Sequence, residues 1–392
     1  MVHCEWLQIG KHWTRILVCG NFWPRHEPKA NDRLVIIVPG NPGVCDYYED
    51  FCLQLHAKLC DNSPSMNEIV CKKGDVSWSV WVLSHAGHLS YPTELVSYEE
   101  KVPPLLEDQL THHSELFAKL LPSQNNSVVS DAVENTSSIS TIVIGHSIGA
   151  FMILKLLPQI IQQIGNANLR RAFLLFPTFE RMAQSSNGTW FQFCRHWGIH
   201  WAFKQLSRFS AILKWLGIVD FVLWLFYRNG ISDCVRRDEI FRAVFSSMLV
   251  CPLLRSNNLM VVDLIASKNY IHQICCYYRP MFLFTFTGIY TTIEDRVLNN
   301  VLTMAANEMD TVTGIQPDIA SHLKCDSVAP RISAFYSPSD GWTSPGYHED
   351  AKKRFPKADI SMIDGVSHAF VLEENEIEIV VDEILRRVKD LD

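Results

Sequence analysis

Ser147 is the residue of this chain best suited to act as a nucleophile, because it lies at the centre of a Gly-His-Ser-Ile-Gly pentapeptide. A β-branched run at residues 140–144 comes directly before the pentapeptide, and a helical-looking stretch follows at residues 150–164. Glycines on both sides of a serine allow a sharp reversal between strand and helix, which holds the serine oxygen exposed in a strained backbone position. The pattern predicts Ser147 as a nucleophile for acyl transfer, against the plainer alternative of a serine in a turn.

A serine nucleophile needs a base that takes its proton and an acid that orients the base. His368 follows the last predicted strand and is predicted as the general base, and Asp340, in a turn after the preceding strand, as the orienting acid. The competing acid, Asp364, is only four residues from His368 in the same loop. The competing base, His348, lies among acidic residues in a predicted helix and is expected to be solvated. For either catalytic candidate, the alternative is a loop residue that caps a backbone group.

Backbone N–H groups are needed to stabilise the oxyanion that forms when a serine attacks a carbonyl. One usually comes from the residue after the nucleophile, here Ile148, and another from the loop after the third strand. That loop is Pro-Gly-Asn-Pro-Gly, so Gly40 and Asn41 are the candidates. The alternative is a tight turn without a role. The sequence leaves open which N–H points inward.

A second group of polar residues, Ser-His-Ala-Gly-His, follows the predicted strand at 78–83. His85 and His88 suggest a zinc site, but no third ligand lies at a recognisable spacing from them. The sequence therefore predicts neither a metal nor another cofactor.

Alternating strands and helices place these candidates at strand ends. The run 34–38 is uniformly apolar, which is typical of a central parallel strand. The predicted strands are 5–9, 14–19, 34–38, 78–83, 140–144, 171–176, 331–336 and 359–363, and the predicted helices are 47–59, 97–121, 150–164, 346–354 and 373–389. Residues 123–140, rich in Ser, Asn and Thr, are predicted as a surface insertion.

The alternation stops at about residue 177 and resumes at about residue 325. Tryptophan and phenylalanine crowd the first part of this segment, and the apolar run 211–227 is interrupted by Lys214 and Asp220. The run is short for a transmembrane helix but suits a helix that lies in a membrane interface, as does the apolar stretch 281–290. The alternative is a helical cap whose apolar faces pack on the sheet and enclose a substrate pocket.

Composition narrows the class of protein further. The chain has 392 residues, 47% of them hydrophobic, which is enough for a large packed core. A net charge of −7 without a block of Lys and Arg argues against nucleic acid as a partner. The 12 cysteines are scattered without a Cys-x-x-Cys pair, and the first residues lack the pattern of a signal peptide. These features indicate reduced thiols and a protein that faces the cytosol.

With these motifs in place, the chain resembles the lipid droplet-associated hydrolase family, a branch of the α/β-hydrolases. The resemblance rests on Val38-Pro39-Gly40-Asn41-Pro42-Gly43, Ser84-His85-Ala86-Gly87-His88, Gly145-His146-Ser147-Ile148-Gly149, Asp340-Gly341-Trp342 and Ser367-His368-Ala369-Phe370. It implies an α/β-hydrolase fold with a mostly parallel central sheet flanked by helices. Residues 1–176 and 326–392 would form the core, and 177–325 a long hydrophobic helical cap or lid.

The same resemblance implies a hydrolase of esters of neutral lipids, such as sterol esters, on the lipid droplet surface and the endoplasmic reticulum. A hydrophobic segment at residues 190–290 would contact the membrane from the cytosolic face. The polar insertion before the strand at 140–144 and the long lid depart from the family pattern and put the shape of the acyl pocket in doubt. An alternative from another class is a protein that binds or tethers the droplet surface and retains the hydrolase fold as a scaffold of low or vestigial activity.

Overall fold

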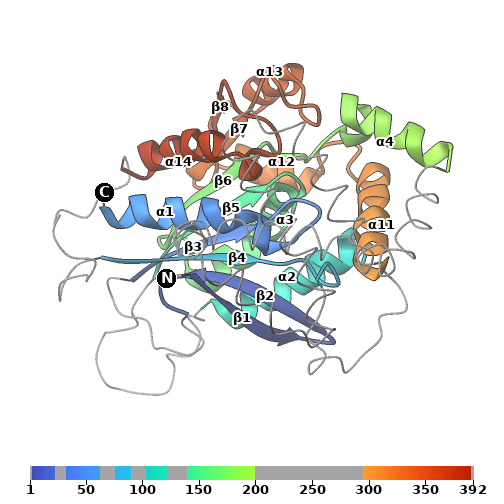
Figure 1. Ribbon diagram of the computed structural model, residues 1–392. Helices are drawn as coiled ribbons and strands as arrows, with labels where there is room; N and C mark the ends of the chain where they lie inside the picture. The colour runs from blue at the N-terminus through green and yellow to red at the C-terminus, as the bar shows by residue number, and fades with distance from the viewer. Residues whose placement is uncertain are drawn as a thin grey trace, which may run out of the picture.

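The computed structural model describes residues 2–22, 32–61, 76–89, 103–121, 139–198 and 295–389 of the chain. Eight strands form one sheet in the order β1-β2-β4-β3-β5-β6-β7-β8 (Figure 1). The strands are β1 (Val2–Ile9), β2 (His12–Cys19), β3 (Asp32–Val38), β4 (Ser77–Leu83), β5 (Ser140–His146), β6 (Leu169–Leu175), β7 (Ile332–Tyr336) and β8 (Asp359–Met362).

The sheet is antiparallel at one edge and parallel elsewhere. β1 and β2 form a hairpin, and β2 pairs antiparallel with β4. All pairs from β4 through β3 and β5 to β8 are parallel. This order, with helices on both faces, is the α/β-hydrolase architecture expected from the sequence.

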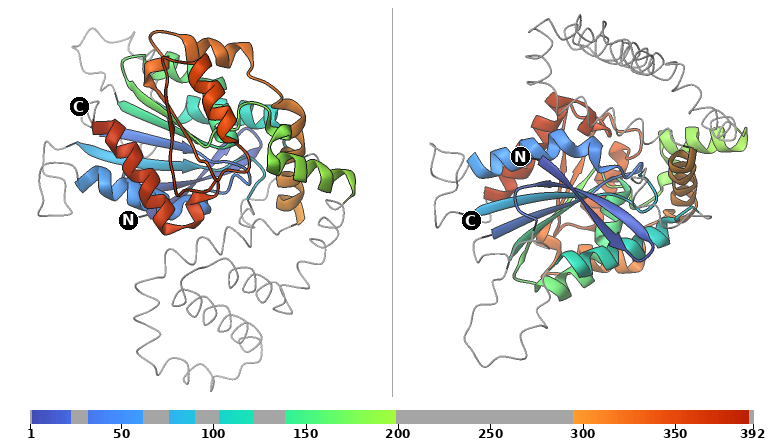
Figure 2. Two further views of the ribbon diagram at one scale, coloured as in Figure 1. Left: turned by 90° about the horizontal axis from the view of Figure 1, so that it is seen from above. Right: turned by 60° about the horizontal axis from the view of Figure 1, so that its bottom comes forward.

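Helices cover both faces of the sheet, because its central strands are apolar on both sides. Figure 2 shows α1 (Glu49–Asp61) and α14 (Glu374–Lys389) on one face, and α2 (Leu106–Leu120) and α3 (Ile148–Ile164) on the other. The pleat of β3 sends Leu34, Ile36 and Val38 into the core beneath α2 and α3, and Val35 and Ile37 into the core beneath α1 and α14.

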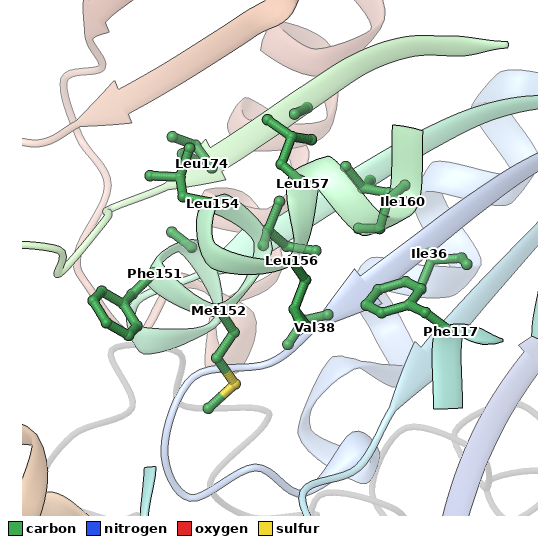
Figure 3. Close-up of a cluster of buried hydrophobic side chains, with 14 of the residues drawn as sticks. Ile36, Val38, Phe117, Phe151, Met152, Leu154, Leu156, Leu157, Ile160 and Leu174 are labelled. Atoms are coloured by element: carbon green, nitrogen blue, oxygen red, sulfur yellow. The ribbon is translucent and has the colours of Figure 1, made fainter. Parts of the chain in front are cut away.

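Helix α3 is the best-buried helix of the described chain and begins directly after Ser147. Its side chains pack with Ile36 and Val38 of β3 and with Phe117 of α2 (Figure 3). A helix that is apolar on nearly all sides is stable only inside a core. The start of α3 is therefore fixed against the sheet.

Two helices and one side chain differ from the sequence prediction. Of the predicted helix 97–121, residues 97–102 lie outside the described residues, 103–105 are not helical, and α2 begins at Leu106. Pro104 disfavours helical backbone at the residue before it. The predicted helix 47–59 begins with a 3₁₀ turn, η2 (Cys45–Tyr48), ahead of α1. His348 of α13 (Pro345–Arg354) is buried beside Tyr336 rather than solvated, so that expectation was wrong.

The segment predicted as a cap is described in part. α4 (Ser186–His196), α11 (Asp295–Thr311) and α12 (Pro317–Lys324) belong to it, and α4 lies beside α11 at the periphery (Figure 1). The apolar runs 211–227 and 281–290 lie outside the described residues. In the ranges described above, no helix is both long and apolar enough to span a bilayer.

Candidate functional site

The predicted site residues meet at one edge of the sheet. Ser147 follows β5, Asp340 follows β7, His368 follows β8, and the loop with Gly40 and Asn41 follows β3. The carboxyl ends of parallel strands lie at the same edge, which is where such sheets bind their ligands.

Ser147 has the backbone of a sharp turn, with φ 53° and ψ −121°. Its N–H donates to the Leu175 carbonyl at 2.9 Å, and its own carbonyl accepts from the N–H of Ala150 at 3.0 Å and of Thr178 at 3.3 Å. A positive φ is unfavourable for a residue with a side chain, so the surrounding hydrogen bonds must hold it. The strained turn presents Oγ at the end of β5.

The two glycines of the pentapeptide are required by close packing. A Cβ at Gly145 would lie 2.5 Å from the Gly149 carbonyl oxygen. A Cβ at Gly149 would lie 2.3 Å from the carbonyl oxygen of Val38 and 2.5 Å from that of Pro39. The absence of a side chain at Gly149 therefore lets α3 approach the loop after β3.

Ser147, His368 and Asp340 are joined by hydrogen bonds. The distance from His368 Nε2 to Ser147 Oγ is 2.9 Å, and the distance from His368 Nδ1 to Asp340 Oδ2 is 2.7 Å. Because a carboxylate accepts, Nδ1 carries the proton and Nε2 is left to accept from the serine hydroxyl. Asp364, the competing acid, is exposed and takes no part in this chain of hydrogen bonds.

Asp340 is held as a carboxylate by donors on both of its oxygens. Oδ1 accepts from the N–H of Trp342 at 2.7 Å and of Thr343 at 3.2 Å, and Oδ2 accepts from the Thr343 hydroxyl at 2.6 Å. Burial raises the pKa of Asp340, but the hydrogen bond and charge of His368 and the bonds from Thr343 and Trp342 outweigh it and hold the pKa below its ordinary value.

The loop that carries His368 is fastened to its neighbours. The hydroxyls of Ser337 and Ser339 both donate to the carbonyl of Val366, the latter at 2.8 Å. The N–H and hydroxyl of Ser367 both donate to Glu376 Oε2, at 2.9 and 2.7 Å. A short loop held at this many points keeps the imidazole orientation fixed.

The loop after β3 lies against Ser147. A Cβ at Gly40 would lie 2.8 Å from Ser147 Cβ, so only glycine fits there. The Gly40 N–H already donates to Tyr48 Oη at 2.8 Å. The Gly40 N–H is therefore not free for an oxyanion, and the N–H groups of Asn41 and Ile148 remain the two candidate donors. Ile148 is the first residue of α3, where backbone N–H groups are not used within the helix.

The side chain of Asn41 ties this loop to α11. Its Nδ2 donates to the Val301 carbonyl and to Glu308 Oε1, both at 3.1 Å. Burial raises the pKa of Glu308 to about 8, while the hydrogen bond from Asn41 acts in the opposite direction. Sequence reasoning missed Glu308, because nothing near it in the sequence marks it as a partner of Asn41.

His85 and His88 lie behind the same loop. His88 Nδ1 donates to the Pro42 carbonyl at 2.7 Å, and the ring of His85 occupies the space where a Cβ of Gly43 would be. His85 Nδ1 lies 3.0 Å from Nε2 of His113 in α2. No group of three metal-ligating side chains converges within the described residues. The histidines support the loop through hydrogen bonds and packing.

The matching family and the relatives in sequence share one name. The family described as lipid-droplet associated hydrolase matches residues 31–235 and 236–371. A lipid droplet-associated hydrolase of Gallus gallus is 26% identical over 380 residues, covering 95% of this chain and 91% of the relative. The Homo sapiens relative of that name is 24% identical over 380 residues, covering 96% and 92%.

The solved structure of haloalkane dehalogenase DbeA from Bradyrhizobium elkani USDA94 is similar in fold. It has a TM-score of 0.51 and 10% sequence identity, and the match covers 100% of both chains. At this identity the likeness concerns the fold alone.

The packing at Gly149 gives a prediction for stability. Gly149→Ala should lower the free energy of unfolding by roughly 1–3 kcal/mol, because the new methyl group meets two backbone carbonyls that cannot rotate away. Urea unfolding measures the change. Gly314→Ala is the matched control, since a Cβ there meets no atom within 4 Å. Equal stability of the two variants would contradict the packing argument.

The buried histidines give a prediction for acid stability. Burial lowers the pKa of His88 to about 4 and of His113 to about 3 in the folded chain. Below pH 6.5 the unfolded chain therefore binds protons that the folded chain does not, and stability is lost as the pH falls. Each histidine contributes a slope of about 1.4 kcal/mol per pH unit near pH 5. Urea unfolding at pH values around 5 should show a slope about 1.4 kcal/mol per pH unit smaller for His113→Gln than for the wild type; identical slopes would contradict it.

Proposed function

Because the chain belongs to the lipid-droplet associated hydrolase family, we propose that it is a serine ester hydrolase that acts on lipid esters at the droplet surface. The observation that carries this proposal is the chain of hydrogen bonds from Ser147 Oγ to His368 Nε2 and from His368 Nδ1 to Asp340 Oδ2. These three residues, predicted from separate parts of the sequence, have the geometry that serine catalysis requires.

The proposed reaction has two steps. His368 Nε2 takes the proton of Ser147 as Oγ attacks the ester carbonyl, and the N–H groups of Ile148 and Asn41 stabilise the oxyanion. His368 then protonates the leaving alcohol, which departs and leaves an acyl group on Ser147. Water attacks this acyl group with His368 again as the base; the bond to Ser147 Oγ then breaks, His368 returns the proton to Oγ, and the free acid leaves. Asp340 keeps the proton of His368 on Nδ1 throughout.

Neutral lipid esters, such as sterol esters, are the substrates we propose. The names of the relatives associate them with lipid droplets, whose contents are esters of this kind. We also propose that the chain works at the surface of droplets and of the endoplasmic reticulum, from the cytosolic side. An exposed aromatic surface on α4 supports a lipid contact.

This aromatic surface consists of Trp190, Phe193 and Trp197, which are 64%, 46% and 67% exposed. Trp190 and Phe193 stack with ring centroids 5.4 Å apart, and Phe193 contacts Trp197 at 5.9 Å. Their spacing of three and four residues sets them on one side of the helix. Indole and phenyl rings partition into the interface of a lipid layer. The same observation favours the second candidate function, a protein that binds or tethers droplets.

A fluorophosphonate probe, which labels activated serines, tests the hydrolase proposal. We expect the purified protein to be labelled in the presence of a lipid emulsion and Ser147→Ala to remain unlabelled. Asp340→Asn should slow labelling by roughly 10³- to 10⁴-fold, because the imidazole would then favour the wrong tautomer. The matched control is Asp364→Asn, at an exposed acid near His368. An unlabelled wild type would leave the tethering function as the better proposal, and labelling that survives in Ser147→Ala would contradict the role given to Ser147.

Flotation with phospholipid-coated triolein droplets tests the aromatic surface. We expect the triple variant Trp190→Ala, Phe193→Ala and Trp197→Ala to bind at least tenfold more weakly, because each ring contributes on the order of 1.5–3 kcal/mol when it leaves water. The double variant Leu105→Ala and Leu372→Ala is the control, since these are the other large exposed apolar side chains of the described chain. Droplet binding that is equal in both variants would contradict the role given to α4.

A further inference from the structure

His146 lies between the loop that carries His368 and the loop after β3. Its Nε2 is 2.9 Å from the carbonyl oxygen of His368, and its Nδ1 is 2.6 Å from Tyr48 Oη. Tyr48 Oη in turn accepts the Gly40 N–H at 2.8 Å. His146 is the residue directly before the proposed nucleophile, so both loops are joined through the elbow itself.

The direction of each hydrogen bond follows from the groups involved. A carbonyl oxygen only accepts, so His146 Nε2 carries a proton and donates to His368. Burial lowers the pKa of His146 to about 3, and the charge of His368 acts in the same direction. The ring is therefore neutral, its Nδ1 accepts, and the Tyr48 hydroxyl donates to it. Each group therefore donates to the next: the Gly40 N–H to Tyr48, the Tyr48 hydroxyl to His146, and His146 Nε2 to the carbonyl of His368.

The surroundings leave this arrangement little freedom. Tyr48 and His146 are 4% and 5% exposed. The rings of Phe370 and Phe176 contact His146 edge-on, at centroid distances of 5.2 and 6.2 Å. Apolar rings on these sides offer no alternative hydrogen-bond partner, and a lost partner in a buried site is costly.

We propose that His146 and Tyr48 are positioning residues of the catalytic site, which fix the backbone of His368 relative to the oxyanion loop. This role rests on the proposed function, because it concerns the geometry of the serine reaction. The known contacts of the His368 loop, through Val366 and Ser367, hold residues before the histidine. His146 holds the carbonyl of His368 itself. At the other end of this series of hydrogen bonds, Tyr48 holds the N–H of Gly40, next to Asn41, the proposed oxyanion donor.

A shift of either loop would misalign groups that must act on the same carbonyl. Small displacements in an active site lower the rate of the chemical step more than they lower substrate binding. A residue that only supports folding would change the melting temperature and the amount of active protein, but it would not change the turnover of the molecules that remain folded. The kcat of folded protein therefore separates positioning from a purely structural role.

Tyr48→Phe is the first variant, because it removes one hydroxyl and keeps the ring. We expect kcat for a soluble ester, normalised to sites titrated with fluorophosphonate, to fall roughly tenfold with KM changed less than twofold. Tyr347→Phe is the matched control, since it likewise removes a tyrosine hydroxyl that donates a hydrogen bond, in this case to the carbonyl of Arg181 at 3.1 Å. Equal kcat in the two variants would overturn the proposal. His146→Gln, which keeps an N–H donor, should retain more activity than His146→Ala.

A second measurement does not need turnover or a variant. Long-range ¹H–¹⁵N spectra of the wild-type protein with ¹⁵N-labelled histidine should show His146 neutral at pH 7 with its proton on Nε2. A proton on Nδ1, or an imidazolium ring, would overturn the chain of donors whatever the kinetics. If wild type and Ser147→Ala are both unlabelled by the probe, the proposed function fails instead. The two failures are thus distinguishable.

Discussion

The turn at Ser147 is the constraint on which the rest of the site depends. Its left-handed backbone is held by hydrogen bonds to β6 and to the segment that follows β6, and by glycines that allow α3 to lie against the loop after β3. The apolar burial of α3 holds this turn in place, since the helix cannot move without opening the core. The same packing of α3 on the sheet therefore stabilises the core and orients the serine.

Much of this arrangement could be predicted from the sequence. Each strand with a strong apolar or β-branched run was predicted to within a few residues, because short runs rich in β-branched residues favour strands over helices. The meeting of Ser147, Asp340 and His368 follows from strand order alone: all three lie just after parallel strands, and parallel strands end at the same edge. Their catalytic role stays a prediction.

Other parts of the site could not be predicted, for identifiable reasons. Tyr48 and His146 interact across 98 residues, and Asn41 and Glu308 across 267. Neither pair has a spacing that indicates contact. His348 looked solvated because its neighbours in the sequence are acidic, but helix periodicity turns it inward while Glu349 faces solvent. Residues 103–105 were predicted as helix but precede α2, because Pro104 disfavours helical backbone at the residue before it.

The position of β7 in the sheet has a consequence for biosynthesis. β7 pairs directly with β6, yet residues 176–331 separate the two strands in the chain. Closing a long loop costs only about 0.6 kcal/mol for each doubling of its length, so the finished fold tolerates this insertion. A ribosome adds 5–20 residues per second, so β6 has an unpaired edge for roughly 8–30 s before β7 emerges. During that time the nascent protein exposes a hydrophobic strand edge that a chaperone, or another nascent copy, is able to bind.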